Sequence, residues 1–197
     1  MHMQYFGDSY DIVKQSLIHW LGRFGDWSVH PMLTESATAQ QVERFEWFLG
    51  ARVLSTEVLT TSTNRESYLS CGTECGNLFL DPDTGFRSRE GGTRAPRTKY
   101  LFAHELVRLT EQRCRALTLV FDQSLPRGKE NDYMERKLAD LRANGIHCFA
   151  YMSHACFIVG GRDEVLVRHA FDCVVTESRL PEARFLSGRA ATSESDC

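Results

Sequence analysis

The stretch Asn77-Leu-Phe-Leu-Asp81-Pro82 decides the fold, together with a similar run at Leu117-Thr-Leu-Val-Phe-Asp122. Both runs are short and continuously apolar, which is typical of parallel strands that are buried on both faces. Helical spacing between the two runs provides a crossover helix, with apolar side chains at Tyr100, Leu101, Leu106 and Leu109. We therefore predict two adjacent parallel strands, each of which ends at an aspartate.

The rest of the chain alternates between helix and strand patterns. Helical spacing covers residues 8–22, a stretch capped by Ser36, residues 133–141 before Asn144-Gly145, and residues 165–175. Strands are expected at residues 27–34 and 52–60. Two further strands, at 147–154 and 156–159, are too close for a crossover and predict an antiparallel hairpin. Residues 61–76 predict no regular element, and the Gly- and Arg-rich segment 83–98 is a candidate lid.

This order of elements predicts one α/β domain over residues 1–188. The expected architecture is a three-layer, doubly wound, Rossmann-like sandwich whose mostly parallel sheet carries a C-terminal antiparallel hairpin. In such sheets ligands bind outside the carboxyl ends of the strands, where the two aspartates are expected. The small and polar residues 189–197 predict a disordered tail.

Composition limits the classes of function. The chain has 197 residues, of which 42% are hydrophobic and 25% charged, and its formal net charge is -3. This balance gives no support to non-specific binding of nucleic acid or anionic membranes. One loop is locally basic and is a candidate contact for nucleic acid, through Arg87, Arg89, Arg94, Arg97 and Lys99. No run approaches the roughly 20 apolar residues of a membrane helix, so a cytoplasmic location and no membrane partner are expected.

Seven cysteines are spread along the chain, mostly within apolar runs. An odd number in such runs is typical of reduced thiols that pack as small hydrophobic groups. Cys71 and Cys75 form a C-x3-C pair, but no second pair at ligand spacing follows it. A zinc site therefore has little support, and metal binding by these two residues stays open.

The strand ends hold the candidate catalytic residues. Asp81 ends one apolar run and Asp83 follows two residues later, while Asp122, Gln123 and Ser124 end the next run. Neighbouring strands lie about 4.8 Å apart, so these carboxylates could share a cation or a polar ligand in one open crevice. Carboxylates held close together repel, so at least one should have a raised pKa. The alternative is local, because the same residues start turns without any ligand.

The first helix supplies three candidate binding residues at steps of three, Asp8, Asp11 and Lys14. A row at this spacing could border the same crevice. The competing and favoured interpretation is capping, with Asp8 at the N-cap and Asp11 three positions later. His154, in the expected hairpin turn, is either a base or a solvated turn residue, and the second is favoured.

Common motifs for nucleotides and acyl-enzyme chemistry do not occur in the sequence. It has no G-x-G-x-x-G, G-x4-G-K-[ST], G-x-S-x-G or H-E-x-x-H. Nucleotide triphosphates, dinucleotides and a serine nucleophile therefore lose most of their support.

Two motifs carry a resemblance. Gly7-Asp8-Ser-Tyr-Asp11-Ile-Val-Lys14 and Phe79-Leu-Asp81-Pro82-Asp83-Thr-Gly85 resemble a bacterial and phage family with G-D-x-x-D-x-x-K and F-L-D-P-D-[NT]-G, whose role is unknown. That family is distantly similar to the rRNA adenine-N6 methyltransferases, whose D-P-P-Y strand end grips the target amino group. The resemblance implies a methyltransferase-like scaffold. Two departures put the activity in question: Asp83-Thr84 replaces the Pro-aromatic pair, and the strand from Trp27 ends in His30-Pro31-Met32 without a glycine loop for S-adenosylmethionine.

Three functions remain open on these grounds. One is an S-adenosylmethionine-dependent transferase acting on nucleic acid, active or degenerate. Another is a phosphoesterase or nuclease that uses Mg²⁺ or Mn²⁺ at the acidic strand ends. The third is a non-catalytic binding protein. The sequence indicates neither the substrate nor the oligomeric state.

Overall fold

The computed structural model describes residues 6–73, 76–91 and 96–187. Its helices are α1 (Ser9–Leu21), α2 (Ala39–Leu49), α3 (Arg65–Ser70), α4 (Ala103–Glu111), α5 (Glu130–Ala143) and α6 (Glu164–Ser178). Short 3₁₀ turns follow at Gly22–Phe24, Arg97–Lys99 and Glu182–Arg184. The strands are β1 (Trp27–His30), β2 (Arg52–Val53), β3 (Asn77–Leu80), β4 (Gly85–Arg87), β5 (Tyr100–Phe102), β6 (Thr118–Asp122), β7 (His147–Met152), β8 (Cys156–Gly161) and β9 (Phe185–Leu186).

The main sheet has seven strands in the order β2-β1-β3-β6-β8-β7-β9. The first four run parallel, and β8 inserts antiparallel between β6 and β7. The predicted hairpin is therefore confirmed, with its second strand next to the parallel part. The predicted adjacent parallel strands are also confirmed, because β3 and β6 pair with Leu80 opposite Val120.

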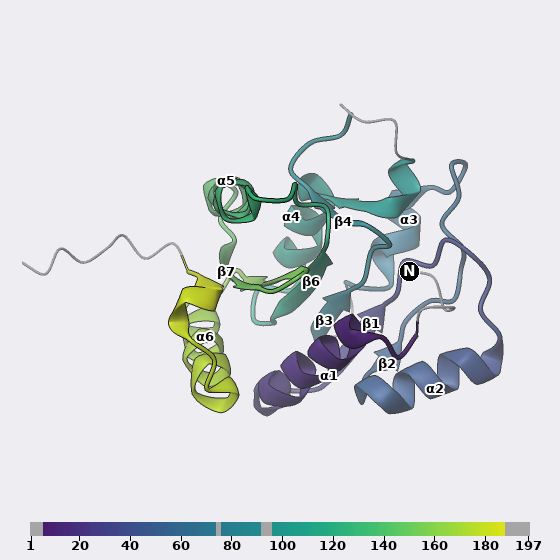
Figure 1. The fold of residues 1–197 in the computed structure, drawn as a ribbon. Coiled ribbons are helices and arrows are strands. Elements are labelled where there is room, and N and C mark those ends of the chain that lie inside the picture. The colour runs from purple at the N-terminus through teal and green to yellow at the C-terminus, as the bar shows by residue number, and fades with distance from the viewer. Residues whose placement is uncertain (1–5, 74–75, 92–95, 188–197) are drawn as a thin grey trace, which may run out of the picture.

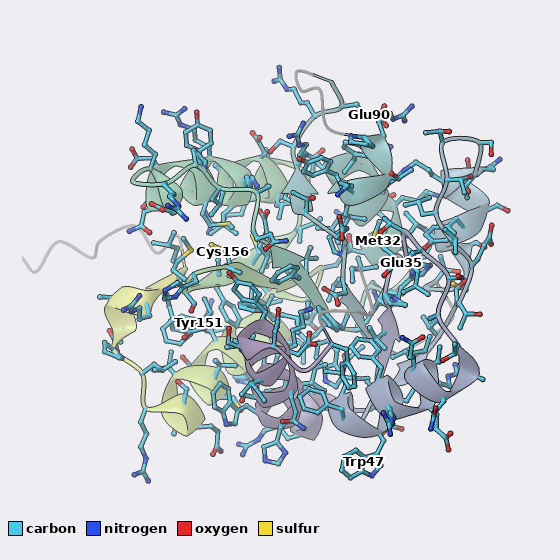
Figure 2. All side chains as sticks on the ribbon, turned by 45° about the vertical axis from the view of Figure 1, so that its right-hand side comes forward. Met32, Glu35, Trp47, Glu90, Tyr151 and Cys156 are labelled. Atoms are coloured by element: carbon cyan, nitrogen blue, oxygen red, sulfur yellow. The ribbon has the colours of Figure 1, made fainter. Side chains whose placement is uncertain are left out.

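Helices cover both faces of this sheet, so the three-layer α/β sandwich is confirmed (Figure 1). One apolar layer lies between the sheet and α1, α2 and α6, and includes Leu17, Phe45 and Val174. The other lies between the sheet and α3, α4 and α5, and includes Leu69 and Leu138. Side chains fill both layers (Figure 2). None of the helices in the described ranges has the length and apolar character needed to cross a membrane.

Several boundaries differ from the expectations, and β pairing explains most of them. Residues 52–60 form a strand only at Arg52–Val53, because β1 itself ends at His30 and offers no longer ladder. Tyr100 and Leu101 belong to strand β5 rather than to a helix, because they pair with β4 inside the segment predicted as a lid. Residues 61–76, predicted irregular, contain α3, whose N-cap is Asn64.

Local capping explains where the helices begin and end. The N-cap of α2 is Thr38 and not Ser36, since Thr38 forms a reciprocal capping box with Gln41. The predicted end of α5 at Asn144-Gly145 is confirmed, and Gly145 has a φ of +73°. The predicted tail at residues 189–197 lies outside the described residues, as do Cys75 and Arg94.

Candidate functional site

Lys14 joins the two motifs by pairing with Asp81, which lies 67 residues after it in the sequence. Its Nζ lies 2.9 Å from Asp81 Oδ2, directly after β3, and 2.9 Å from Asp11 Oδ1 on α1. All three residues are buried, with exposed fractions of 5% for Lys14, 2% for Asp11 and 1% for Asp81. The structure thus brings Asp11, Lys14 and Asp81 together, and it encloses them.

Capping and pairing coexist at the start of α1. Asp8 accepts hydrogen bonds from the backbone N–H groups of Tyr10 and Asp11, at 2.8 and 3.1 Å, and is exposed. Asp11 accepts one from the backbone N–H of Gly7 at 2.8 Å and also pairs with Lys14. Asp8 is therefore the N-cap of α1 and lies outside the buried cluster. Asp11 both stabilises the first turn of α1 and belongs to the buried cluster through its pair with Lys14.

The surroundings of this cluster are apolar. The Lys14 ammonium lies 4.5 Å from the centre of the Phe121 ring, so its charge meets the aromatic face. Burial lowers the pKa of Lys14, but Asp81 and Asp11 together raise it above its usual value. Burial raises the pKa of Asp81 above its usual value, and the nearby charge of Lys14 offsets only part of this increase. One expected carboxylate thus has a raised pKa, with burial as the main cause rather than repulsion.

A second buried aspartate, Asp122, also pairs with a lysine. Asp122 is fully buried and pairs with Lys137, which projects from α5. Ser124 closes the cluster, because its Oγ donates to Asp122 Oδ1 at 2.6 Å. Lys137 also donates to the backbone carbonyl of Phe86 at 2.7 Å, so it ties β4 to this strand end.

The expected shared crevice does not form, because Asp81 and Asp122 point to opposite faces of the sheet. With Leu80 opposite Val120 in the register, Asp81 lies level with Phe121 and not with Asp122. Successive side chains alternate between faces, so Asp81 faces α1 while Asp122 faces α5. The two strand ends are neighbours in the sheet, but their carboxylates belong to different layers.

The segment after Asp81 folds over the strand ends. Thr84 accepts a backbone hydrogen bond from Gln123 at 3.1 Å, and the carbonyl of Asp83 accepts another from the Gln123 side chain at 2.9 Å. The Asp83 carboxylate pairs with Lys99 at 3.0 Å. Asp83 and Gln123 therefore hold this segment against β6, and Gln123 is the exposed member of the pair.

A metal site receives no support from the described side chains. Among them no group of three histidines, cysteines or carboxylates is placed to hold an ion. Asp81, Asp83 and Asp122 each face a lysine instead, which supplies the positive charge that a cation would bring. His154 is exposed in the hairpin turn, as the favoured interpretation expected.

Sequence reasoning assigned no role to two residues of this region, His30, which it placed only at a strand end, and Lys137. His30 ends β1 and is fully buried, with Nε2 3.0 Å from the carbonyl of Tyr68 and Nδ1 accepting from Met32 N–H at 3.3 Å. Burial lowers the pKa of His30 to about 4, so the ring is neutral. The spacing of α5 could have identified Lys137 as inward-facing, because it stands three residues after Met134 and four before Leu141 on the apolar stripe of the helix.

No family model, curated protein or solved structure matches this chain.

Proposed function

We propose that this chain is a degenerate methyltransferase-like protein, which keeps the scaffold and binds nucleic acid without transferring a methyl group. The observation that carries the proposal is the ion pair between Lys14 and Asp81, at 2.9 Å and with Asp81 1% exposed. The resemblance assigns the carboxylate of this strand end to the target amino group. A carboxylate in that role needs an oxygen open to the substrate, whereas Asp81 is enclosed and shared with a lysine.

The cofactor side of the scaffold supports the same proposal. The end of β1, where a glycine loop would hold S-adenosylmethionine, is occupied by the buried residues His30, Met32 and Leu33. The imidazole of His30 packs 4.6 Å from the Tyr68 ring, centre to centre. Side chains fill this strand end, which favours a structural role over cofactor binding.

The proposal that the chain binds nucleic acid rests on the resemblance and on the exposed residue Arg89. Arg97 pairs with Glu90 at 2.7 Å, and Lys99 pairs with Asp83 at 3.0 Å, so both are partly neutralised. The guanidinium of Arg87 lies 3.8 Å from the Tyr100 ring centre. Arg89 is exposed and has no ion pair within the described residues. Arg89 is thus the best placed of these groups to contact a phosphate.

Cofactor titration tests the transfer part. Calorimetric titration of S-adenosylmethionine, Mg²⁺ and Mn²⁺ into the wild type and Asp81→Asn should give no saturable heat in either. A methyl-transfer assay on RNA should also be blank. Saturable binding of S-adenosylmethionine that Asp81→Asn abolishes would restore the transferase, and the same result with Mn²⁺ would restore the metal enzyme.

Anisotropy of a labelled single-stranded RNA tests the nucleic-acid part. We expect binding to weaken as salt rises, and Arg89→Ala to weaken it further and to reduce the salt slope by about one. The matched control is Arg168→Ala on α6, an exposed arginine paired with Glu164. Equal loss in both variants, or no binding to RNA at low salt, contradicts this part.

A further inference from the structure

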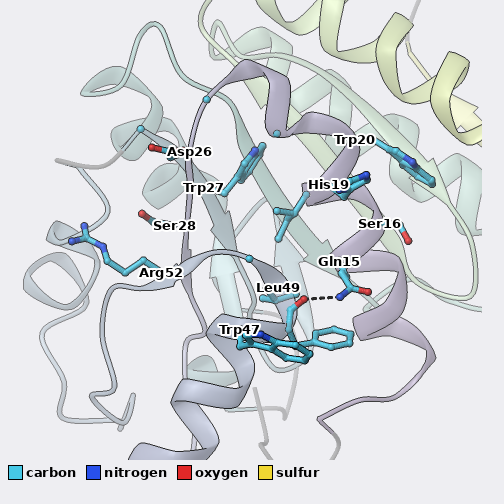
Figure 3. Close-up of a pocket in the computed structure, with 16 residues that line it drawn as sticks. Gln15, Ser16, His19, Trp20, Asp26, Trp27, Ser28, Trp47, Leu49 and Arg52 are labelled. Atoms are coloured by element: carbon cyan, nitrogen blue, oxygen red, sulfur yellow. Dashed lines mark hydrogen bonds between the residues drawn. The ribbon is translucent and has the colours of Figure 1, made fainter.

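A hollow of about 1030 Å³ opens beside the amino ends of β1 and β2 (Figure 3). Because these strands run parallel to β3 and β6, it lies at the opposite end of the sheet from the strand-end aspartates. Its walls are α1, α2 and the amino ends of β1 and β2, through residues such as Gln15, Leu49, Trp27 and Arg52. The side chain of Gln15 donates to the carbonyl of Phe48 at 2.6 Å and so joins the two helices. This volume is in the range of sites that hold small organic ligands.

All three tryptophans of the chain line this hollow, namely Trp20, Trp27 and Trp47. Trp27 is buried, with its indole N–H directed to the carbonyl of Leu21. Trp47 is 86% exposed and projects from α2 into solvent (Figure 2). An exposed indole beside a hollow offers a flat apolar face on which a planar ring can stack.

Ser28 adds a hydrogen-bonding group to the hollow. It lines the hollow and is 9% exposed, yet its hydroxyl forms no hydrogen bond with any described residue. This hydroxyl is not enclosed, because the only fully buried side-chain N or O atom without a partner among the described residues is Arg162 Nε. The Ser28 hydroxyl therefore faces the open hollow and is available to a polar atom of a bound molecule.

The charges of the lining indicate which kind of ring it takes. Two charged residues of the lining flank Ser28: Arg52 lies opposite it in the strand register, and Asp26 precedes it by two residues. Both are exposed, and neither forms an ion pair within the described residues. Their formal charges cancel, so the hollow offers no excess of positive charge to a polyphosphate. Arg52 supplies donors and Asp26 supplies acceptors, which together suit the mixed donor and acceptor edge of a nucleobase.

We propose that this hollow binds a purine nucleoside. The base stacks on Trp47, its polar edge meets Arg52 and Asp26, and Ser28 bonds a polar atom of the ligand. This site is separate from the strand ends and does not depend on the proposed function.

Intrinsic fluorescence tests the proposal, because every tryptophan of the chain borders the hollow. Guanosine and adenosine are titrated into the full chain, with GMP and glucose as comparison ligands, and calorimetry gives the affinities. At least one purine nucleoside should quench the fluorescence saturably. GMP should bind no more tightly than guanosine, and glucose should have no effect. Tighter binding of GMP, equal quenching by glucose, or no saturable quenching by either nucleoside overturns the proposal.

Variants separate stacking from a general effect on folding. By calorimetry, Trp47→Ala should weaken nucleoside binding by about five- to 100-fold, whereas Trp47→Phe should retain most of it. The melting temperature should stay close to wild type in both, since Trp47 is 86% exposed. The matched control is Tyr133→Ala, which removes another exposed aromatic ring, on α5. Unchanged affinity in Trp47→Ala, or an equal loss in Tyr133→Ala, contradicts the site.

Discussion

Asp81 and Asp122 end neighbouring parallel strands, yet each turns to a different face of the sheet and meets a lysine from the helix that covers that face. Lys14 of α1 holds Asp81, and Lys137 of α5 holds Asp122. The two carboxylates thus fasten the two helical layers to the central strands. This arrangement accounts for buried charge at the carboxyl edge without a ligand or a metal.

Gly85 should be intolerant of a side chain. It has a φ of +142°, and a Cβ there would collide with Asp122 Oδ1 and come within 2.9 Å of the Asp122 Cα. Gly85→Ala should lower the free energy of unfolding by about 3 kcal/mol or more, through backbone strain and overpacking together. Chemical denaturation measures the change.

Gly128→Ala is the matched control for Gly85. Its φ is also positive, at +77°, but a Cβ there would meet nothing within 4 Å. This variant should lose about 1 kcal/mol from the backbone alone. Equal losses at both glycines would contradict close packing of the segment against Asp122.

Phe79 should be a main contributor to the core of the parallel strands. It is fully buried in β3, so Phe79→Ala should lower the free energy of unfolding by about 3–5 kcal/mol through the cavity it leaves. The control is Ile12→Ala on α1, where the side chain is 51% exposed and the loss should be about 1 kcal/mol or less. A thermal melt of Phe79→Ala that hardly moves would place this residue outside the core.

We expect the protein to lose stability in mild acid because of His30. Burial lowers its folded pKa to about 4 from the ordinary 6.5, so the unfolded chain binds the proton more readily. The contribution of neutral, buried His30 to the free energy of unfolding is therefore complete above pH 6.5 and is lost as the pH falls toward 4. A difference of about 2.5 between the two pKa values amounts to about 3 kcal/mol.

Denaturation of wild type and His30→Gln between pH 7 and 4 isolates this contribution. The variant is expected to be less stable at pH 7, because the bonds to Tyr68 and Met32 are disturbed. Its stability should nevertheless fall less steeply with acid. Parallel curves for the two proteins would show that His30 is not the titrating group.

The main features of the fold follow from the sequence because burial on both faces leaves a simple pattern. The uninterrupted apolar runs at β3 and β6 identified the central strands, and the short spacing between β7 and β8 identified the hairpin. The pairing of β4 with β5 was not predicted, because Gly85–Arg87 and Tyr100–Phe102 are three residues each and flank the Gly- and Arg-rich segment, which was predicted as a loop. Strands that short carry no periodic signal of their own.

Only part of the candidate site could be predicted from the sequence. The motifs located Asp81 and Lys14, which the structure joins, but strand register decides which face a carboxylate takes. A register is a tertiary property, and one residue of slip exchanges the faces. Without it, Asp81 and Asp122 were expected in one crevice, and the role of Lys137 could not be assigned from its place on α5.

Lys14 and Asp81 act as a structural pair, and a double-mutant cycle on the free energy of unfolding measures the coupling between them. Lys14→Met leaves Asp11 and Asp81 buried without their cation, so it should cost about 3–5 kcal/mol. Asp81→Asn leaves Lys14 paired with Asp11 and should cost about 1 kcal/mol or less. The double variant should be more stable than Lys14→Met alone, with a coupling energy of about 2 kcal/mol. If the two single effects simply add, or if Lys14→Met is as stable as wild type, Lys14 and Asp81 do not act as a structural pair.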